Sequence, residues 1–489
     1  MIPGYFYPAS IGLCLVVVIA AYFLNNPIRH GSWFMTRRFI NWFPLGMTYA
    51  FLCMGRYNII VAKSALGALM SNEDIGIIFS AGTCVYALSF LVNGPLIDRK
   101  IGGKAGMLIS AFGASLANAA LGVLTWLIVA RHWKLNLVWS FSLLYSVNMY
   151  FQSFGSMSII KVKAYWFHVR ERGVFGAIFG TLISIGVYFA FDWGGSIISL
   201  TRANAPDNFL KTMFLPAGST VDATWAVFYI PAAILIFWLL ADWWLIKDSP
   251  ELAGLPPFDT HDASSGQMHV EFSVLDLLEK VFTSKLMLLV ACVELTGGVF
   301  RYSMTQWYPI FRGESNQAGA DYLWQHWGWF GCVFGIIGGF SAGLISDKLF
   351  QSRRGPPTAL LCGSALALAA AMAVFMLTQP VIVGWAAVLI IMVSIGITSL
   401  MSGTAATDFG GRKATATCMG IVNGFAYIGC GIQSLGLGLL LGNRNSNWMW
   451  LPIFVMPFAV IGTIISIKIW HELPAATRKY IAEVEQKKV

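Results

Sequence analysis

The chain has 489 residues, of which 57% are hydrophobic and only 11% are charged, with a mean hydropathy of +0.67 and a formal net charge of +9. Soluble globular chains carry about 25% charged residues, so this composition excludes a water-soluble protein. The positive charge argues against a nucleic-acid partner because it forms no long basic run. It is typical instead of a membrane protein whose Lys and Arg residues gather in cytoplasmic loops.

Apolar segments long enough to cross a lipid bilayer, which takes about 20 residues, follow one another along the chain. The first segment, 9–25, lacks the preceding basic residues of a signal peptide, so we interpret it as a retained, extra N-terminal transmembrane helix. Twelve further spans are predicted in two groups of six: 39–62, 74–97, 105–129, 136–163, 173–200 and 224–246, then 285–310, 323–345, 357–377, 382–404, 414–441 and 448–470.

A polar, proline-containing stretch between the two groups reads as a linker. The predicted parts of the chain are the extra helix with its cytoplasmic connection (1–38), a first six-helix bundle (39–246), the cytoplasmic linker (247–284), a second six-helix bundle (285–470) and a cytoplasmic tail (471–489). Of the 32 Lys and Arg residues, the loops that we assign to the cytoplasm hold about three times as many as the opposite side. We therefore expect a bacterial inner-membrane protein with its C-terminus in the cytoplasm and its N-terminus outside.

The two predicted bundles repeat each other in sequence. Three pairs of residues lie at similar separations of 249, 245 and 243 positions: Asp98 and Asp347, Arg56 and Arg301, and Gly186 and Gly429. Similar separations at three places indicate a duplicated six-helix unit. The eight cysteines lie mostly inside apolar segments without metal-ligand spacing, so we expect buried thiols and neither a metal nor a cofactor.

The loop after the second main span carries glycine, aspartate and basic residues, and the loop after the eighth repeats part of the pattern. The residues concerned are Gly94, Asp98 and Arg99 in the first copy and Gly343 and Asp347 in the second. Glycine permits close helix approach, and the aspartate can pair with basic loop groups across the bundle, which suits a gating role. The pattern resembles the major facilitator superfamily, which implies an all-α membrane fold of two pseudo-symmetric six-helix bundles.

Further motifs resemble one branch of that superfamily, the organophosphate:phosphate antiporters that exchange glycerol-3-phosphate or hexose phosphates. They are CMGRYN around Arg56, FRYSMTQWYP around Arg301, WFHVRERG at 166–173, DSPELAGLPP at 248–257 and GIVNGFAYIG at 420–429. The likeness covers about 430 residues and leaves out the extra helix. It implies exchange of a small anionic substrate for inorganic phosphate by alternating access. We expect a monomer in the lipid bilayer.

Arg56 and Arg301 lie deep inside predicted spans, where insertion of an arginine costs about 2.5–3.5 kcal/mol. Both follow the nearest inner-flank cation by similar lengths of helix, so their depths match. Two buried guanidinium groups on facing helices repel each other unless an anion lies between them, and the planar fork of arginine suits phosphate or carboxylate. The alternative is that each arginine is structural and pairs with an internal acid.

Tyr49 and Glu294 each precede one of these arginines by seven residues and therefore share its helix face. We predict that Glu294 accepts a proton coupled to transport or contacts a hydroxyl or amine of the substrate. The equal alternative is that it pairs with Lys161 or Lys163, and Lys161 is itself a candidate for substrate contact. The resemblance adds Tyr427 as a donor to the substrate. We expect Asp192 to lie near the outer end, in solvent.

Three positions depart from the antiporter pattern. A family histidine is replaced by Ile183, a family lysine by Phe90 and a family tryptophan by Ser156. The arginine pair is retained while the rest of the predicted cavity is more apolar, which favours an organic anion with an apolar or aromatic body. Two alternatives remain: a proton-coupled symporter of carboxylates or sugar acids that uses Glu294, and a transporter-like ligand sensor without flux. The sequence argues against a membrane enzyme, since no span carries a Ser/His/Asp set, an HExxH motif or a paired-carboxylate motif, and no nucleotide-binding motif is present.

Overall fold

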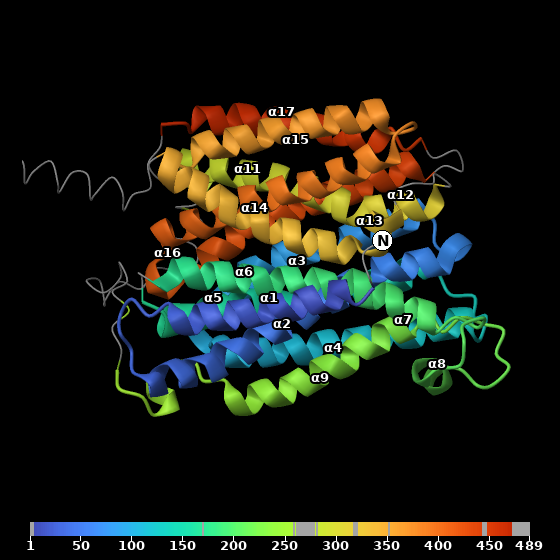
Figure 1. The fold of residues 1–489 in the computed structure, drawn as a ribbon, viewed down its shortest axis with the longest axis horizontal. Helices are drawn as coiled ribbons and strands as arrows, with labels where there is room; N and C mark the ends of the chain where they lie inside the picture. The colour runs from blue at the N-terminus through green and yellow to red at the C-terminus, as the bar shows by residue number, and fades with distance from the viewer. Residues whose placement is uncertain are drawn as a thin grey trace, which may run out of the picture.

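The computed structural model describes residues 4–168, 171–257, 260, 279, 282–315, 321–350, 353–442 and 447–471, and the regular secondary structure within these ranges is helical (Figure 1). The first part comprises α1 (Phe6–Leu24), α2 (Ser32–Leu66), α3 (Asn72–Leu96), α4 (Gly103–Val129), α5 (Leu137–Trp166), α6 (Arg172–Tyr188), α7 (Gly194–Leu200), α8 (Phe209–Phe214) and α9 (Ala226–Leu245). The second comprises α11 (Lys285–Tyr302), α12 (Tyr308–Glu314), α13 (Asp321–Gln325), α14 (Trp327–Leu349), α15 (Gly355–Phe375), α16 (Pro380–Leu441) and α17 (Trp450–Lys468).

Short turns of 3-10 or π-helix continue several of these helices. They are η1 (Gly67–Leu69), η2 (Ile97–Ile101), η4 (Phe189–Trp193), η5 (Glu251–Ala253) and η7 (Ser303–Trp307). Because η4 joins α6 to α7 and η7 joins α11 to α12, each of these trios forms one long helical segment that corresponds to a single predicted span. The π-turn in each segment re-aims the side chains that follow it.

Eleven helical segments of the described chain are long and apolar enough to cross a membrane, and each coincides with a predicted span. The two remaining predicted spans are α2 and α5, which are long but more polar because they carry arginines, lysines and buried amides. One boundary prediction was wrong. The spans 382–404 and 414–441 belong to the single helix α16, and the loop expected around Arg412 and Lys413 is helical, since no proline interrupts it.

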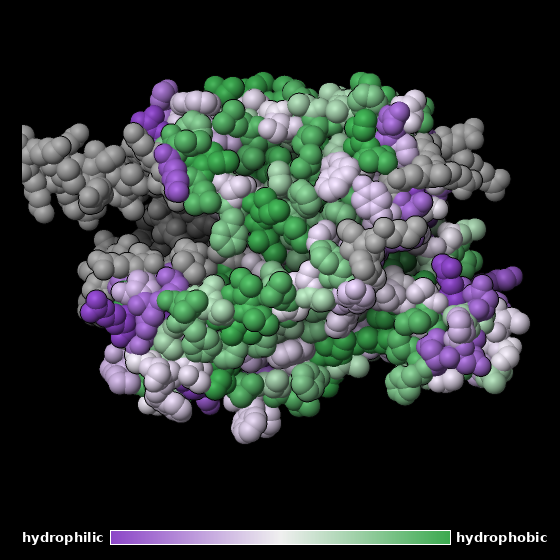
Figure 2. Space-filling model, in the orientation of Figure 1, coloured by the Kyte–Doolittle hydropathy of each residue, from purple (hydrophilic) through white to green (hydrophobic). Residues whose placement is uncertain are grey.

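The surface supports a multi-pass membrane protein. Apolar residues cover the middle of the molecule, and hydrophilic residues gather at its two ends (Figure 2). Large apolar side chains such as Leu88, Phe112, Leu143 and Trp244 are exposed on several helices. An apolar belt between two polar ends is the surface that a bilayer requires.

The two bundles pack against each other through two pairs of long helices. Helix α3 packs along α16, and α6 packs along α14. The second group, with α11, α15 and α17, lies on one side of these pairs, and α2, α4 and α9 lie on the other (Figure 1). The helix α1 lies outside this plan and contacts α6.

The sequence repeat has a direct structural counterpart at two glycines. Gly186 of α6 faces the backbone carbonyl of Ala50 in α2, and Gly429 of α16 faces the carbonyl of Leu295 in α11. Ala50 and Leu295 are themselves 245 residues apart, which is the separation of the arginine pair. Each bundle therefore brings its first helix against its fifth through the same backbone contact, for which a Cβ leaves no room.

The Gly429→Ala substitution is expected to lower the stability of the protein. A Cβ at this position would overlap the carbonyl of Leu295, so the helices must separate at a cost of about 1–3 kcal/mol. The measurement is the midpoint of thermal unfolding in detergent. The matched control is Gly363→Ala in α15, where a Cβ meets nothing within 4 Å and helix propensity predicts an equal or higher midpoint. Equal midpoints for the two variants would contradict the packing argument.

Candidate functional site

Arg56 lies in the middle of α2, and its guanidinium group is buried among neutral partners. Its Nε donates a hydrogen bond to Oε1 of Gln152 at 2.9 Å, and its two terminal nitrogens donate to the hydroxyls of Tyr427 at 2.6 Å and Tyr86 at 3.1 Å. Its Cζ also lies 4.7 Å from the ring centre of Tyr86. Because Tyr427 belongs to α16 and the other partners to the first bundle, Arg56 joins the two bundles.

Arg301 lies near the end of α11, just before the π-turn η7, and is only partly buried. Within the described residues its guanidinium makes no hydrogen bond and no ion pair, and its Cζ lies 5.6 Å from the ring centre of Tyr302. The ring of Tyr302 lies 5.5 Å from that of Tyr427, the residue that Arg56 contacts. The two arginines, from opposite bundles, therefore lie beside two neighbouring tyrosines, Tyr427 for Arg56 and Tyr302 for Arg301.

Aromatic side chains surround this pair. Tyr49 and Tyr57 of α2 are buried on the same stretch of helix as Arg56, and Tyr57 lies within electrostatic range of both guanidinium groups. Phe90 of α3 is fully buried, with its ring 4.7 Å from Tyr86 and 6.2 Å from Tyr427. This position, at which the sequence departs from the antiporter pattern, therefore packs an apolar ring against two of the partners of Arg56.

A ladder of buried amides holds Arg56 in place. Asn148 of α5 donates to the carbonyl of Gly55 at 2.8 Å, Gln152 donates to Asn148, and Asn58 donates to Asn118 of α4 at 2.7 Å. These contacts tie α2 to α4 and α5 on both sides of the arginine. Sequence reasoning missed them, although amides four residues apart on one face of an apolar helix, as at 148 and 152, are a usable signal.

Glu294 is fully buried in α11, about two helical turns before Arg301 on the same face of the helix. Its Oε2 accepts a hydrogen bond from the hydroxyl of Thr398 in α16 at 3.3 Å, and its Oε1 has no hydrogen-bond partner among the described residues. The predicted alternative of a pair with Lys161 is wrong. The ammonium of Lys161 contacts the carbonyl and Oδ1 of Asp98 at 3.0 and 3.2 Å.

The expected contact of Lys161 with substrate stays a prediction, and the contact with Asp98 shows where its ammonium lies. This contact joins α5 to the π-turn η2 inside the first bundle, at the loop that carries the superfamily pattern. In that loop Gly94 is buried and Arg99 is exposed. In the second copy of the pattern Gly343 has open space around it, and the side chain of Asp347 lies outside the described part of the chain.

At the end of the molecule that the cation count assigns to the outside, which we call the predicted outer end, ion pairs and hydrogen bonds join the bundles. Lys63 of α2 contacts Glu314 of α12 at 3.0 Å, and Asn72 of α3 donates to the same carboxylate at 3.0 Å. Asp192 was expected to be in solvent, but it is buried. Its Oδ1 accepts the backbone N–H of Gly328 at 2.8 Å because the start of α14 packs directly on η4.

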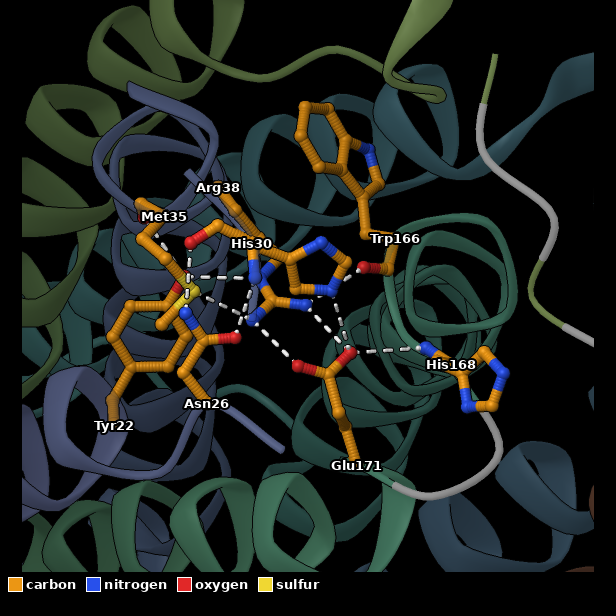
Figure 3. Close-up of polar contacts among 8 residues, drawn as sticks. All are labelled: Tyr22, Asn26, His30, Met35, Arg38, Trp166, His168 and Glu171. Carbon is orange, nitrogen blue, oxygen red and sulfur yellow. Dashed lines mark hydrogen bonds and ion pairs between the residues drawn. The ribbon is translucent and has the colours of Figure 1, made fainter. Parts of the chain in front are cut away.

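At the opposite end, a second buried arginine forms a different kind of cluster (Figure 3). The two terminal nitrogens of Arg38 donate to the two carboxylate oxygens of Glu171 at 2.8 and 2.9 Å, and Nε2 of His30 lies 3.4 Å from the same carboxylate. Burial raises the pKa of Glu171, but the hydrogen bonds of His30 and Arg38 and the charge of Arg38 outweigh it and lower that pKa to about 2. Arg38 is thus neutralised by an acid, whereas Arg56 and Arg301 have no such pairing in the described chain.

Loss of the Tyr427 hydroxyl is expected to lower the rate of the transport that the family resemblance implies by about tenfold. Tyr427→Phe removes the 2.6 Å hydrogen bond to Arg56 and keeps the ring, and a hydrogen bond to a charged group contributes about 1.5–3 kcal/mol. The measurement is the initial rate of substrate uptake into proteoliposomes. Tyr150→Phe, which changes an exposed tyrosine of α5, is the control and should leave the rate unchanged. A normal rate for Tyr427→Phe would remove this hydroxyl from the site.

Comparison with known proteins agrees with this fold and with the apolar surface. Residues 45–434 match the family described as Major Facilitator Superfamily. The chain is 24% identical over 423 residues to the membrane sensor protein UhpC of Salmonella typhimurium. This match covers 84% of this chain and 86% of that protein. It is 24% identical to the glycerol-3-phosphate transporter of Bacillus subtilis, over 79% of this chain and 81% of the relative. It is 22% identical to a probable hexose phosphate transport protein of Chlamydia trachomatis, over 90% of this chain and 92% of that protein.

Among solved structures, a bacterial homolog of the human lysosomal transporter Spinster, in its inward-facing and unoccupied conformation, has a TM-score of 0.67. It is 13% identical and the match covers 93% of this chain and 99% of that one, so the likeness shows the fold alone. These findings define the class: a multi-pass membrane transporter and not an enzyme. The chain belongs to the major facilitator superfamily, and its distant relatives include the organophosphate:phosphate antiporters.

Proposed function

We propose that this chain exchanges an organic phosphate ester or phosphonate for inorganic phosphate by alternating access. The observation that carries the proposal is the arginine pair. Arg56 and Arg301 come from equivalent positions in the two bundles, lie beside the neighbouring rings of Tyr427 and Tyr302 and have no carboxylate partner in the described chain. Two such cations in a low-dielectric interior leave a net positive charge that a bound anion would neutralise.

The partners of Arg56 suit reversible binding. Its present acceptors are two tyrosine hydroxyls and one amide, which are all neutral. Hydrogen bonds from arginine to a phosphate oxygen are charge-assisted and stronger than those to neutral groups, so an arriving phosphate can replace the hydroxyls. The displaced tyrosines can in turn donate to the anion, since a hydroxyl is both donor and acceptor.

The relatives and the lining of the site together favour phosphate over other anions. Two of the relatives are described as transporting glycerol-3-phosphate and hexose phosphate. The aromatic side chains around the pair, with Phe90 among them, favour an apolar or aromatic body attached to the phosphate group. Recognition then divides between an anionic end at the arginines and a ring or alkyl group against Tyr86 and Phe90.

The test is counterflow of phosphate in proteoliposomes. Vesicles loaded with unlabelled phosphate should accumulate [³²P]phosphate, and phosphonates or phosphate esters with aromatic groups should inhibit this uptake more strongly than glycerol-3-phosphate does. A ligand screen by thermal shift gives the same ranking independently of flux. No exchange, together with no phosphate-dependent stabilisation, would overturn the proposal.

A second candidate, a proton-coupled symporter of organic anions, is favoured by Glu294. A buried carboxylate with one oxygen unpartnered in the described chain is costly when ionised, so it is suited to binding a proton. If this reading holds, uptake should need an inward proton gradient and Glu294→Gln should abolish the gradient dependence. The matched control adds Gln306→Glu to the Glu294→Gln variant. Gln306 is a buried polar residue of η7 that has no proton-binding role in this reading, so its new carboxyl group should not restore the gradient dependence of uptake. If the proton gradient changes uptake neither in the parent nor in Glu294→Gln, and the two take up substrate at the same rate, the result supports the exchanger.

A third candidate is a ligand sensor without flux, because one relative is described as a membrane sensor protein. It predicts stabilisation by the ligand in the thermal-shift screen but no accumulation of label in vesicles. The two measurements together therefore separate all three candidates. Exchange without a gradient indicates an antiporter, gradient-driven uptake indicates a symporter, and binding alone indicates a sensor.

A further inference from the structure

The helix α1 is attached to both bundles, one at each of its ends. Tyr7, Ile11, Val18 and Tyr22 lie on one face of the helix and are buried, whereas Leu13 on the opposite face is 64% exposed. A helix with one buried face is docked against protein along its length. The buried face passes along α6 of the first bundle.

The C-terminal end of α1 is held by the first bundle. The hydroxyl of Tyr22 donates to the carbonyl of Met35 at 2.8 Å and accepts a hydrogen bond from Nε of Arg38 at 3.0 Å. Its ring lies 5.1 Å from that of Trp42. Since Arg38 is also bound to Glu171, this end of α1 belongs to a buried network that includes the start of α2 (Figure 3).

The N-terminal end of α1 is held by the second bundle. The indole N–H of Trp329 in α14 donates to the hydroxyl of Ser10 at 2.7 Å. The ring of Tyr7 stacks on His326 with ring centres 3.4 Å apart, and it meets Trp329 edge-on at 5.5 Å. These contacts lie at the predicted outer end, next to the place where Asp192 of η4 accepts the N–H of Gly328.

We infer that α1 is a strap that crosses the seam between α6 and α14 and stabilises the state in which the predicted outer end is closed. Alternating access requires the two bundles to rock, and opening this end moves α14 away from η4 and α6. Because Tyr22 keeps α1 on the first bundle, the opening must break the contacts of Ser10 and Tyr7 with α14. Contacts present in one state and absent in the other shift the equilibrium toward the first.

The contacts at risk are the hydrogen bond from Trp329 to Ser10 and the ring contacts of Tyr7 with His326 and Trp329. Loss of these contacts is expected to raise the ratio of outer-open to outer-closed protein by about tenfold or more. The inference does not depend on the substrate. It depends on the closed contacts of the outer end and on the two-bundle fold of the superfamily.

The test measures distances across the outer end by double electron–electron resonance on the full-length protein in nanodiscs. Spin labels are placed through an unnatural ketone side chain at Arg202 and Thr378, so that the eight native cysteines remain. Both positions are exposed, and they belong to loops of the first and second bundle at this end. The Tyr7→Ala/Ser10→Ala variant is expected to increase the long-distance population about tenfold or more, and Leu13→Ala is expected to leave it unchanged.

A double-mutant cycle protects the test against simple loss of folding. Ser10→Ala removes the hydrogen bond from Trp329 with little change in volume, whereas Trp329→Phe removes the same hydrogen bond and also alters the ring contact with Tyr7. The strap therefore predicts a shift for Ser10→Ala, a shift at least as large for Trp329→Phe, and no further shift when Ser10→Ala is added to Trp329→Phe. A melting midpoint close to that of the parent confirms that each variant is folded. An unchanged distance distribution in Tyr7→Ala/Ser10→Ala, or an equal shift in Leu13→Ala, overturns the inference.

Discussion

The Arg56→Lys variant is expected to lose phosphate exchange by about 100-fold or more while remaining folded. Lysine keeps the positive charge but replaces the planar fork with a single ammonium, so the contacts to Tyr427, Tyr86 and Gln152 cannot all be made. Two hydrogen bonds to a charged group are worth about 3 kcal/mol or more together, which corresponds to roughly a hundredfold change in affinity. The measurement is the initial rate of [³²P]phosphate counterflow per protein in the vesicles.

Two comparisons make this result specific. Arg301→Lys should show a loss of similar size, because the pair acts on one anion from two bundles, and the double variant should be little worse than either single variant. Arg202→Lys, at an exposed position outside the helices, should exchange phosphate at the parent rate. If Arg56→Lys retained more than a tenth of the parent rate, the bidentate role of this guanidinium would be excluded.

The fold and the arginine pair were predictable because they depend on features local to the sequence. Apolar runs of about 20 residues define membrane helices without reference to their neighbours, and a fixed separation between matching residues reveals a duplicated bundle. The structure adds the reason for that repeat at Gly186 and Gly429, which meet the equivalent carbonyls of Ala50 and Leu295. An arginine deep in a span is conspicuous in the sequence for the same local reason.

The errors concern contacts between segments that are distant in the chain. The alternative pairing of Lys161 with Glu294 was wrong, since Lys161 contacts Asp98 and the rotation of α5 is determined by packing and not by its sequence pattern. Asp192 was placed in solvent, and only the approach of α14 buries it. The partners of Arg56 on α3, α5 and α16 were not predicted, except for Tyr427, which the family resemblance supplied.

The same contrast between neutral and acidic partners separates two kinds of arginine inside the fold, of which Arg38 and Arg56 are buried and Arg301 is partly buried. Arg38 is paired on both terminal nitrogens with Glu171, so it has no charge to offer a ligand. Arg56 lies among tyrosines and an amide, and Arg301 lies beside a tyrosine ring. An ion pair suits a permanent joint between segments, whereas weaker neutral partners suit a site that must bind and release an anion.

Glu171→Gln is expected to destabilise the protein by about 3–5 kcal/mol, because it leaves the buried guanidinium of Arg38 without its counter-ion. The measurement is the free energy of unfolding in denaturant, or the melting midpoint where unfolding is irreversible. The matched control is Asp207→Asn. It breaks the Asp207–Lys211 pair, in which the carboxylate is 89% exposed, and should cost less than about 1 kcal/mol. Equal effects of the two substitutions would contradict a buried ion pair.

The pH dependence has a definite sign. The pKa of Glu171 is about 2 in the folded protein, below the unfolded value of about 4.3, so ionised Glu171 stabilises the fold fully above pH 5. This contribution is lost as the pH falls from about 4.5 toward 2. The stability difference between the parent and Glu171→Gln should therefore shrink as the pH falls below about 4.

Removing the charges of both Arg38 and Glu171 tests whether the loss of stability in Glu171→Gln comes from the unpaired charge of Arg38. Arg38→Met combined with Glu171→Leu leaves no buried charge unpaired and should recover much of the stability that Glu171→Gln loses. The double variant also removes the hydrogen bond from Arg38 to Tyr22, which holds α1. If its stability recovers but the predicted outer end opens more often, the charge pair and the attachment of α1 are separate functions of the same arginine. Failure to recover any stability would show that the geometry of the arginine, and not its charge balance, holds this end together.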